Sequence, residues 1–135
     1  YNVPLEDFMF AIKNAIENGY SISIGGDVSE SGYSSTHDIA MVPSYDIPSE
    51  YIDENARQFR FSNATTTDDH AIHLIGYKID ENEDWWFLIK DSGSGARNGN
   101  FPGYYFYHED FVKLKMMTFT IHKDAVRSTL DKFNK

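Results

Sequence analysis

The sequence predicts an α+β fold: a curled, barrel-like antiparallel β-sheet flanked by helices. Short segments rich in β-branched and aromatic residues follow one another at 71–79, 85–90, 104–107 and 116–122. Strands joined by short connections pair antiparallel, and helices then cover the sheet. The chain has 135 residues, of which 41% are hydrophobic and 16% aromatic, which suffices for one core. Residues 1–135 are therefore expected to form a single domain.

An amphipathic helix is expected over residues 5–18, and a half-buried strand follows it. Pro4 precedes the helix, and Gly19 stands where helix ends favour glycine. The apolar residues at helical spacing are Leu5, Phe8, Met9, Ile12 and Ile16. In the strand, Tyr20, Ile22 and Ile24 alternate with serines. A tight turn or a bulge is expected at Gly25-Gly26.

The region from residue 29 to residue 59 is expected to hold a long loop and a second helix. Residues 29–48 are rich in Ser, Gly and Pro, with a short strand or turn at 36–42. Pro48 and Ser49, followed by acidic residues, predict that the helix spans residues 48–59.

A β-hairpin is expected at the centre of the chain, because residues 71–79 and 85–90 flank the polar run 80–84. A turn centred near position 81 or 82 places His70 opposite residues 91–94, and so beside Asp91. A carboxylate bonded to one ring nitrogen of an imidazole leaves the other nitrogen free to take a proton. His70 and Asp91 are therefore a candidate catalytic pair.

Four further elements complete the expected fold. A strand at 104–107 leads into a helical turn at 108–112, and a last strand spans 116–122. Residues 124–133 have the spacing of a short helix or a docked tail.

A family resemblance follows from Asp69-His70-Ala71, the hairpin, Lys90-Asp91-Ser92-Gly93-Ser94, and Gly103-Tyr104. This pattern resembles the C-terminal half of papain-like cysteine peptidases. Residues 3–30 resemble, more narrowly, the bleomycin hydrolase and aminopeptidase C branch. The resemblance implies a papain-like fold and hydrolysis of peptides from a chain end. It also implies that His70 acts as general base and acid, that Asp91 orients it, and that Asp69 and Ala71 line the substrate side.

Two residues depart from the family pattern. Asp91 stands where the family has Asn, and a carboxylate still orients the imidazole. Gly93 stands where the family has Trp, which removes the apolar cover of the pair unless Trp85, Trp86 or Phe101 replaces it. In the bleomycin hydrolase and aminopeptidase C branch, the C-terminal tail enters the active-site cleft. The resemblance implies that residues 123–135 correspond to that tail.

The chain contains no Cys, so it cannot supply the thiolate of a cysteine peptidase. Because the family carries its Cys in the N-terminal half, a chain that opens on Tyr1 is expected to be a fragment, inactive alone, whose partner is the missing half. The alternative is a non-catalytic module of the same fold that binds peptides or a partner. Without its other half, the chain is expected to expose apolar surface and to form a homo-oligomer.

Composition disfavours several other functions. A net charge of -9 opposes binding to nucleic acid and to anionic membranes, and no apolar run approaches the roughly 20 residues of a membrane span. No cofactor is expected, since the glycines lack phosphate-loop spacing. No metal is expected, because His70 and His73 should face opposite sides of a strand. His37 and Asp38 are expected to make ordinary turn bonds. The sequence leaves the cellular compartment open.

Overall fold

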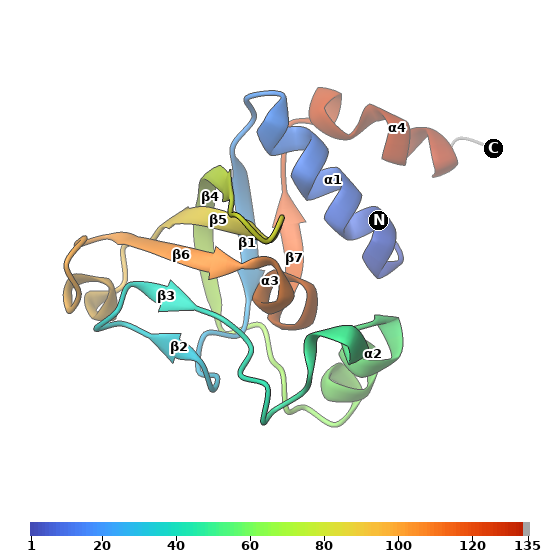
Figure 1. Cartoon of the computed structure of the whole chain (residues 1–135). Coiled ribbons are helices and arrows are strands. Elements are labelled where there is room, and N and C mark those ends of the chain that lie inside the picture. Colours follow the sequence, from blue (N-terminus) through green and yellow to red (C-terminus); the bar gives the residue numbers. More distant parts are fainter. Residues whose placement is uncertain (134–135) are drawn as a thin grey trace.

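Seven strands form one open sheet in the order β2-β3-β6-β5-β4-β1-β7 (Figure 1). The computed structural model describes residues 1–133. The strands are β1 (Ile22–Gly26), β2 (Tyr33–Ser34), β3 (Ile39–Ala40), β4 (His70–Ile79), β5 (Trp85–Lys90), β6 (Tyr104–His108) and β7 (Met116–Thr120). The helices are α1 (Leu5–Glu17), α2 (Glu54–Ser62), α3 (Glu109–Lys115) and α4 (Arg127–Leu130).

The α+β class is confirmed, but two details of the predicted sheet are not. Its edge strands, β2 and β7, lie at opposite ends of the order, so the sheet is not closed and the barrel-like curl is not confirmed. The pairing is antiparallel except between β3 and β6, which run parallel. The parallel pair arises because the short β2-β3 ribbon joins the sheet beside a strand that lies far along the chain.

The core lies between the sheet and α1. This helix was predicted within one residue of its end, and it buries the apolar residues that define its pattern. From the sheet, Ile24, Leu74, Phe87, Ile89 and Tyr107 join the same core, each at most 1% exposed. One face of β1, β4, β5 and β6 is therefore covered, and the other is left to solvent.

The first strand differs from its predicted bounds at both ends, because it starts at Ile22 rather than Tyr20 and includes both glycines. A Cβ atom at Gly26 would lie 2.3 Å from the carbonyl oxygen of Lys115, so only glycine lets β1 approach β7 this closely. The expected bulge is confirmed, because the register with β7 shifts between Gly25 and Gly26.

The prediction of a helix over 48–59 is wrong in its bounds. A 3-10 turn at Ser49–Tyr51 ends at Ile52, which has extended dihedral angles. The helix α2 starts later because the Asp53 carboxylate accepts a hydrogen bond from the Ala56 N–H at 2.8 Å, as an N-cap does. Aspartate at an N-cap thus outweighs the proline signal five residues earlier.

Other boundaries shift by a few residues. The expected helical turn at 108–112 is α3, the last strand ends at Thr120, and the short strand expected within 36–42 is β3. Strand β2 was not predicted, since two residues are too short to show an alternating pattern.

The chain after β7 docks on α1 (Figure 1), which agrees with the expectation of a docked tail at 124–133. It comprises 3-10 turns at Lys123–Val126 and Asp131–Phe133 on either side of α4. Asn14 donates to the Ala125 carbonyl at 3.3 Å, and the ring of Phe133 lies 4.9 Å from that of Tyr1. Residues 134–135, which belong to the tail compared with the family's cleft-entering segment, lie outside the described residues. No helix within residues 1–133 has the length and apolar character needed to cross a membrane.

Candidate active site

The β4-β5 hairpin brings His70 and Asp91 into contact. His70 is the first residue of β4, and Asp91 directly follows the last residue of β5. Their side chains meet with 2.9 Å between His70 Nε2 and Asp91 Oδ1. The proximity predicted from the hairpin is therefore confirmed.

The register of the hairpin is set by its turn and by one bulge. At the turn, Asp80 Oδ1 accepts from the N–H groups of Asn82 and Asp84, and its Oδ2 accepts from Trp86 Nε1. Desolvation acts to raise the pKa of Asp80, but these hydrogen bonds together outweigh it and hold the pKa below its ordinary value. Along the strands, Ile79 pairs with Trp85 and His73 with Lys90, with a shift between Leu74 and Gly76. Residue 70 consequently reaches the level of residues 91–93, as the turn position predicted.

Asp91 is fixed from three sides. Its side chain is 2% exposed, and its Oδ1 also accepts from the Gly93 N–H at 2.8 Å. Its own N–H donates to the Gly103 carbonyl at 2.9 Å, which ties it to the start of β6. A buried carboxylate held in this way has little freedom to turn away from the imidazole.

The pairing determines which ring nitrogen of His70 is available. An ionised carboxylate only accepts hydrogen bonds, so Nε2 carries the proton toward Asp91. Within the described residues, Nδ1 of His70 has no hydrogen-bond partner, and the side chain is 30% exposed. The imidazole thus has one nitrogen anchored by a carboxylate and one nitrogen without a hydrogen-bond partner, which is the arrangement that a general base requires.

Gly93 lies next to this pair and contributes no side chain. A Cβ atom at position 93 would lie 3.6 Å from His70 Cε1 and 3.2 Å from Asp91 Oδ1. A larger side chain there would start directly over the pair. Gly93, which stands where the papain-like pattern has Trp, therefore leaves this position next to the pair without a side chain.

Trp85, Trp86 and Phe101 were considered as replacement covers, and none of them is seen to pack on the His70–Asp91 pair. Trp85 and Trp86 pair with Ile79 and Lys78, at the far end of the hairpin. Trp85 stacks on Tyr77 at 4.6 Å, and Trp86 packs edge-on to His108 at 4.8 Å. Phe101 is 64% exposed.

The two residues that flank His70 have different surroundings. Asp69 Oδ1 accepts from the Val28 N–H at 3.1 Å, and its Oδ2 accepts from the Ser29 hydroxyl at 2.8 Å. Ala71 is exposed on the outer face of the sheet, where it lines a hollow of about 590 Å³. The structure places both beside His70 in the chain, and their substrate-side role stays a prediction.

Asp27 supports the loop next to His70, and sequence reasoning missed it. Its buried carboxylate accepts from the backbone and hydroxyl groups of Ser29 and Thr67. Burial acts to raise the pKa of Asp27, but these hydrogen bonds outweigh it and hold the pKa below its ordinary value. A sequence signal existed, since an acidic residue directly after a buried strand needs local partners.

Asp38 plays a similar part for the loop that precedes β6. Its Oδ2 accepts from the N–H groups of Asn100 and Phe101 at 2.7 and 2.9 Å. His37 points elsewhere, with its Nδ1 2.7 Å from the Ser34 hydroxyl. The expected turn bond is found for His37, whereas the expectation for Asp38 is wrong, because its partners lie 62 and 63 residues along the chain.

Among residues 1–133, no three His, Asp or Glu side chains are grouped so as to hold a metal ion. Comparison with known proteins adds no assignment, because no protein-family model and no curated protein matches the chain.

Proposed function

We propose that this chain is the histidine-bearing half of a papain-like cysteine peptidase of the bleomycin hydrolase and aminopeptidase C branch. The observation that carries the proposal is the 2.9 Å contact between His70 Nε2 and buried Asp91 Oδ1, with Nδ1 left without a hydrogen-bond partner. The sequence around that pair, Asp69-His70-Ala71 and Lys90-Asp91-Ser92, supports the same family.

The proposed chemistry assigns a proton path to His70. A cysteine thiol of the other half, placed beside Nδ1, gives its proton to that nitrogen, and the sulfur attacks the peptide carbonyl carbon. Asp91 stabilises the resulting imidazolium through Nε2. His70 then passes the proton to the leaving amine, and a water molecule, deprotonated in turn by His70, hydrolyses the thioester. The nucleophile and the oxyanion donors belong to the other half.

The test is activity of the protein expressed together with the coding sequence upstream of Tyr1. We expect hydrolysis of aminoacyl-coumarin substrates that iodoacetamide abolishes. His70→Ala should lower kcat by about a hundred- to ten-thousandfold, the range for loss of a general base, and Asp91→Ala should lower it less. His122→Ala is the matched control, because His122 is an exposed histidine that caps a distant turn. Wild-type rates for His70→Ala, or an upstream sequence without Cys, would contradict the proposal.

A second function, a module that binds peptides or a partner without hydrolysis, is favoured by Gly93. The glycine leaves the His70–Asp91 pair without the cover that the family places there. Peptide binding by the upstream-extended protein, with no hydrolysis and no effect of His70→Ala, would support this alternative.

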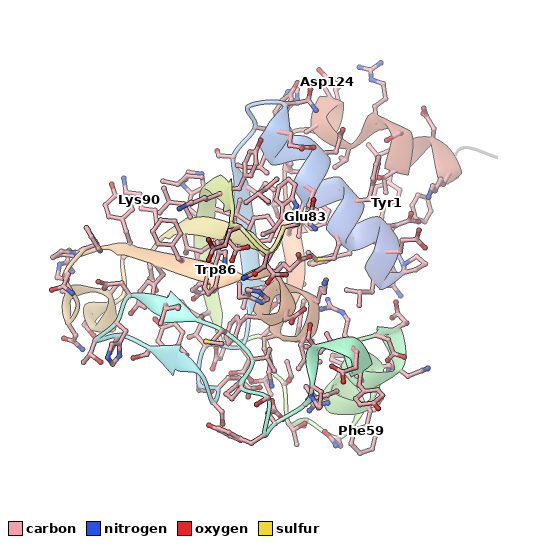
Figure 2. All side chains as sticks on the ribbon, in the orientation of Figure 1. Tyr1, Phe59, Glu83, Trp86, Lys90 and Asp124 are labelled. Carbon is pink, nitrogen blue, oxygen red and sulfur yellow. The ribbon has the colours of Figure 1, made fainter. Side chains whose placement is uncertain are left out.

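The proposal includes an apolar surface that needs a cover, either the other half or a second copy. Four aromatic side chains on and near α2 are more than half exposed, and Phe59 points outward from this helix (Figure 2). They are Tyr45, Tyr51, Phe59 and Phe61. Light scattering of the isolated chain should give a mass above 15.5 kDa, and a strict monomer that binds no hydrophobic dye would oppose this part of the proposal.

A further inference from the structure

A row of polar side chains crosses four strands on the outer face of the sheet. Ser23 pairs with His73, His73 with Lys90, and Lys90 with Tyr104. Their neighbours along the strands, including Ile72, Ile89 and Tyr105, are buried in the core. Because side chains alternate between the faces of a strand, the row faces away from the core. In Figure 2, Lys90 lies on the side of the sheet away from α1.

The whole row lines the hollow of about 590 Å³ that also includes Ala71. The loop between β5 and β6 closes one side of it with Arg97 and Pro102. The hollow therefore combines three basic side chains, the hydroxyl groups of Ser23, Ser92 and Tyr104, and the rings of Tyr104 and Pro102. Its lining also includes Asp91.

The basic groups of this hollow differ from most others in the chain. Lys13, Arg60, Lys113 and Lys115 each lie within 4.0 Å of a carboxylate oxygen. Within residues 1–133, neither Lys90 nor Arg97 has such a neighbour. Carboxylates outnumber basic side chains in this chain, with 21 acidic and 12 basic residues, so basic groups without a carboxylate neighbour are not a consequence of composition. The only carboxylate in the lining, that of Asp91, is engaged by His70 and the Gly93 N–H.

Two of these basic groups are direct cross-strand partners. Side chains at opposed positions of an antiparallel pair lie about 5 Å apart, and like charges there destabilise the pair. His73 and Lys90 occupy such positions, and protonation of His73 would add that cost. An anion between them would offset the cost and would meet hydrogen-bond donors on both sides.

We propose that this hollow is a carboxylate-binding subsite for peptides, which rests on the proposed function and names its substrate class. Arg97 and Lys90 bind the carboxylate, the hydroxyls of Ser23 and Tyr104 supply further hydrogen bonds, and the Tyr104 and Pro102 rings contact the adjoining apolar part. The carboxylate comes from an acidic side chain or from a peptide C-terminus.

The test measures binding of three N-acetylated tetrapeptides to this 135-residue chain by calorimetry at low salt. One carries glutamate and a C-terminal amide, the second carries glutamine and a free C-terminus, and the third carries glutamine and the amide. We expect the first, the second or both to bind about five- to tenfold more tightly than the third. Preference for the first identifies an acidic side chain as the ligand, and preference for the second identifies the C-terminus.

Variants locate the effect. Lys90→Gln and Arg97→Gln should each reduce the preference toward that of the neutral peptide, while Lys90→Arg should retain it. Lys78→Gln is the matched control, because Lys78 is an exposed lysine on the same strand as His73, about 16 Å away along β4. Circular dichroism verifies that each variant is folded, which the exposure of Lys90 and Arg97 favours.

Three outcomes would overturn the inference: equal affinity for the three peptides, no binding of any peptide, or an equal loss with Lys78→Gln. Because no step requires hydrolysis, the result is separate from that of the peptidase assay. If the chain binds carboxylate peptides but the upstream-extended protein shows no hydrolysis, the subsite proposal stands and the peptidase proposal is rejected. If the extended protein hydrolyses peptides but the chain shows no carboxylate preference, the peptidase proposal stands and the subsite proposal is rejected.

Discussion

Gly26→Ala should be among the most damaging single substitutions in the chain, because it forces two strands apart. An added Cβ would lie 2.3 Å from the Lys115 carbonyl oxygen and 2.6 Å from Met116 Cα. Both are backbone atoms, so no side-chain rotation relieves the overlap. Gly26 also pairs with His70 and accepts a hydrogen bond from the Asp69 N–H, so the movement would reach the candidate site.

The size of the effect follows from this geometry. Overpacking costs about 1–3 kcal/mol, and each strand hydrogen bond lost adds about 1 kcal/mol. We therefore expect Gly26→Ala to lower the free energy of unfolding by about 2–4 kcal/mol. This is a large fraction of the roughly 5–15 kcal/mol by which domains of this kind are stable.

Gly76→Ala is the matched control, since Gly76 also lies in a strand but its added Cβ would lie 3.6 Å from Leu88 Cβ, an ordinary contact. Its free energy of unfolding should change by less than about 1 kcal/mol. Urea unfolding followed by tryptophan fluorescence gives both values, and the imidazole resonances of His70 should move only in Gly26→Ala. Equal stabilities of the two variants would refute the close approach of β1 and β7.

Three other predictions concern the surroundings of the candidate site. Asp27→Asn should unfold at a lower urea concentration than the wild type at pH 7. The difference between their urea midpoints should narrow as the pH falls below 3.8, because a carboxylate whose pKa is lowered by folding stabilises the fold above its unfolded-state pKa and loses that contribution as it becomes protonated in the folded state. A difference that stays constant with pH would oppose this. Gly93→Trp should slow deuterium exchange at His70 Cε1, which a Cβ at 93 would approach to 3.6 Å, whereas Gly95→Trp, with nothing within 4 Å, should not. Gly99→Ala should speed tryptic cleavage after Arg97, because its Cβ would displace the Asp38 carboxylate that holds the N–H groups of Asn100 and Phe101, and Gly95→Ala should cleave like the wild type.

Local patterns were sufficient for α1 and for the central hairpin. The α1 stripe is a direct consequence of helical periodicity, and the hairpin register follows from turn length, which is why the contact of His70 with Asp91 could be predicted. The predicted start of α2 was wrong because both Pro48 and Asp53 are residues that favour the start of a helix. The hydrogen bond that the Ala56 N–H donates to the Asp53 carboxylate decides between them.

The open sheet and its single parallel pair could not be predicted, because strand order depends on contacts between segments distant in sequence. The same holds for the supports of the candidate site. Asp27 binds Thr67 across 40 residues and Asp38 binds Phe101 across 63, and neither partner is marked by any local pattern.

The sequence by itself determined the α+β class, the N-terminal helix, the hairpin, and the pairing of an imidazole with a carboxylate, since each depends on residues close in the chain or on one turn. Only the tertiary structure decided that Ser23, His73, Lys90 and Tyr104 form one row, because they come from four strands whose order no local signal specifies. It also decided that Gly93 lies directly beside the His70–Asp91 pair and that both tryptophans lie at the other end of the hairpin. The physical reason is that periodicity and turn chemistry act over a few residues, whereas burial and charge neutralisation depend on which surfaces finally meet.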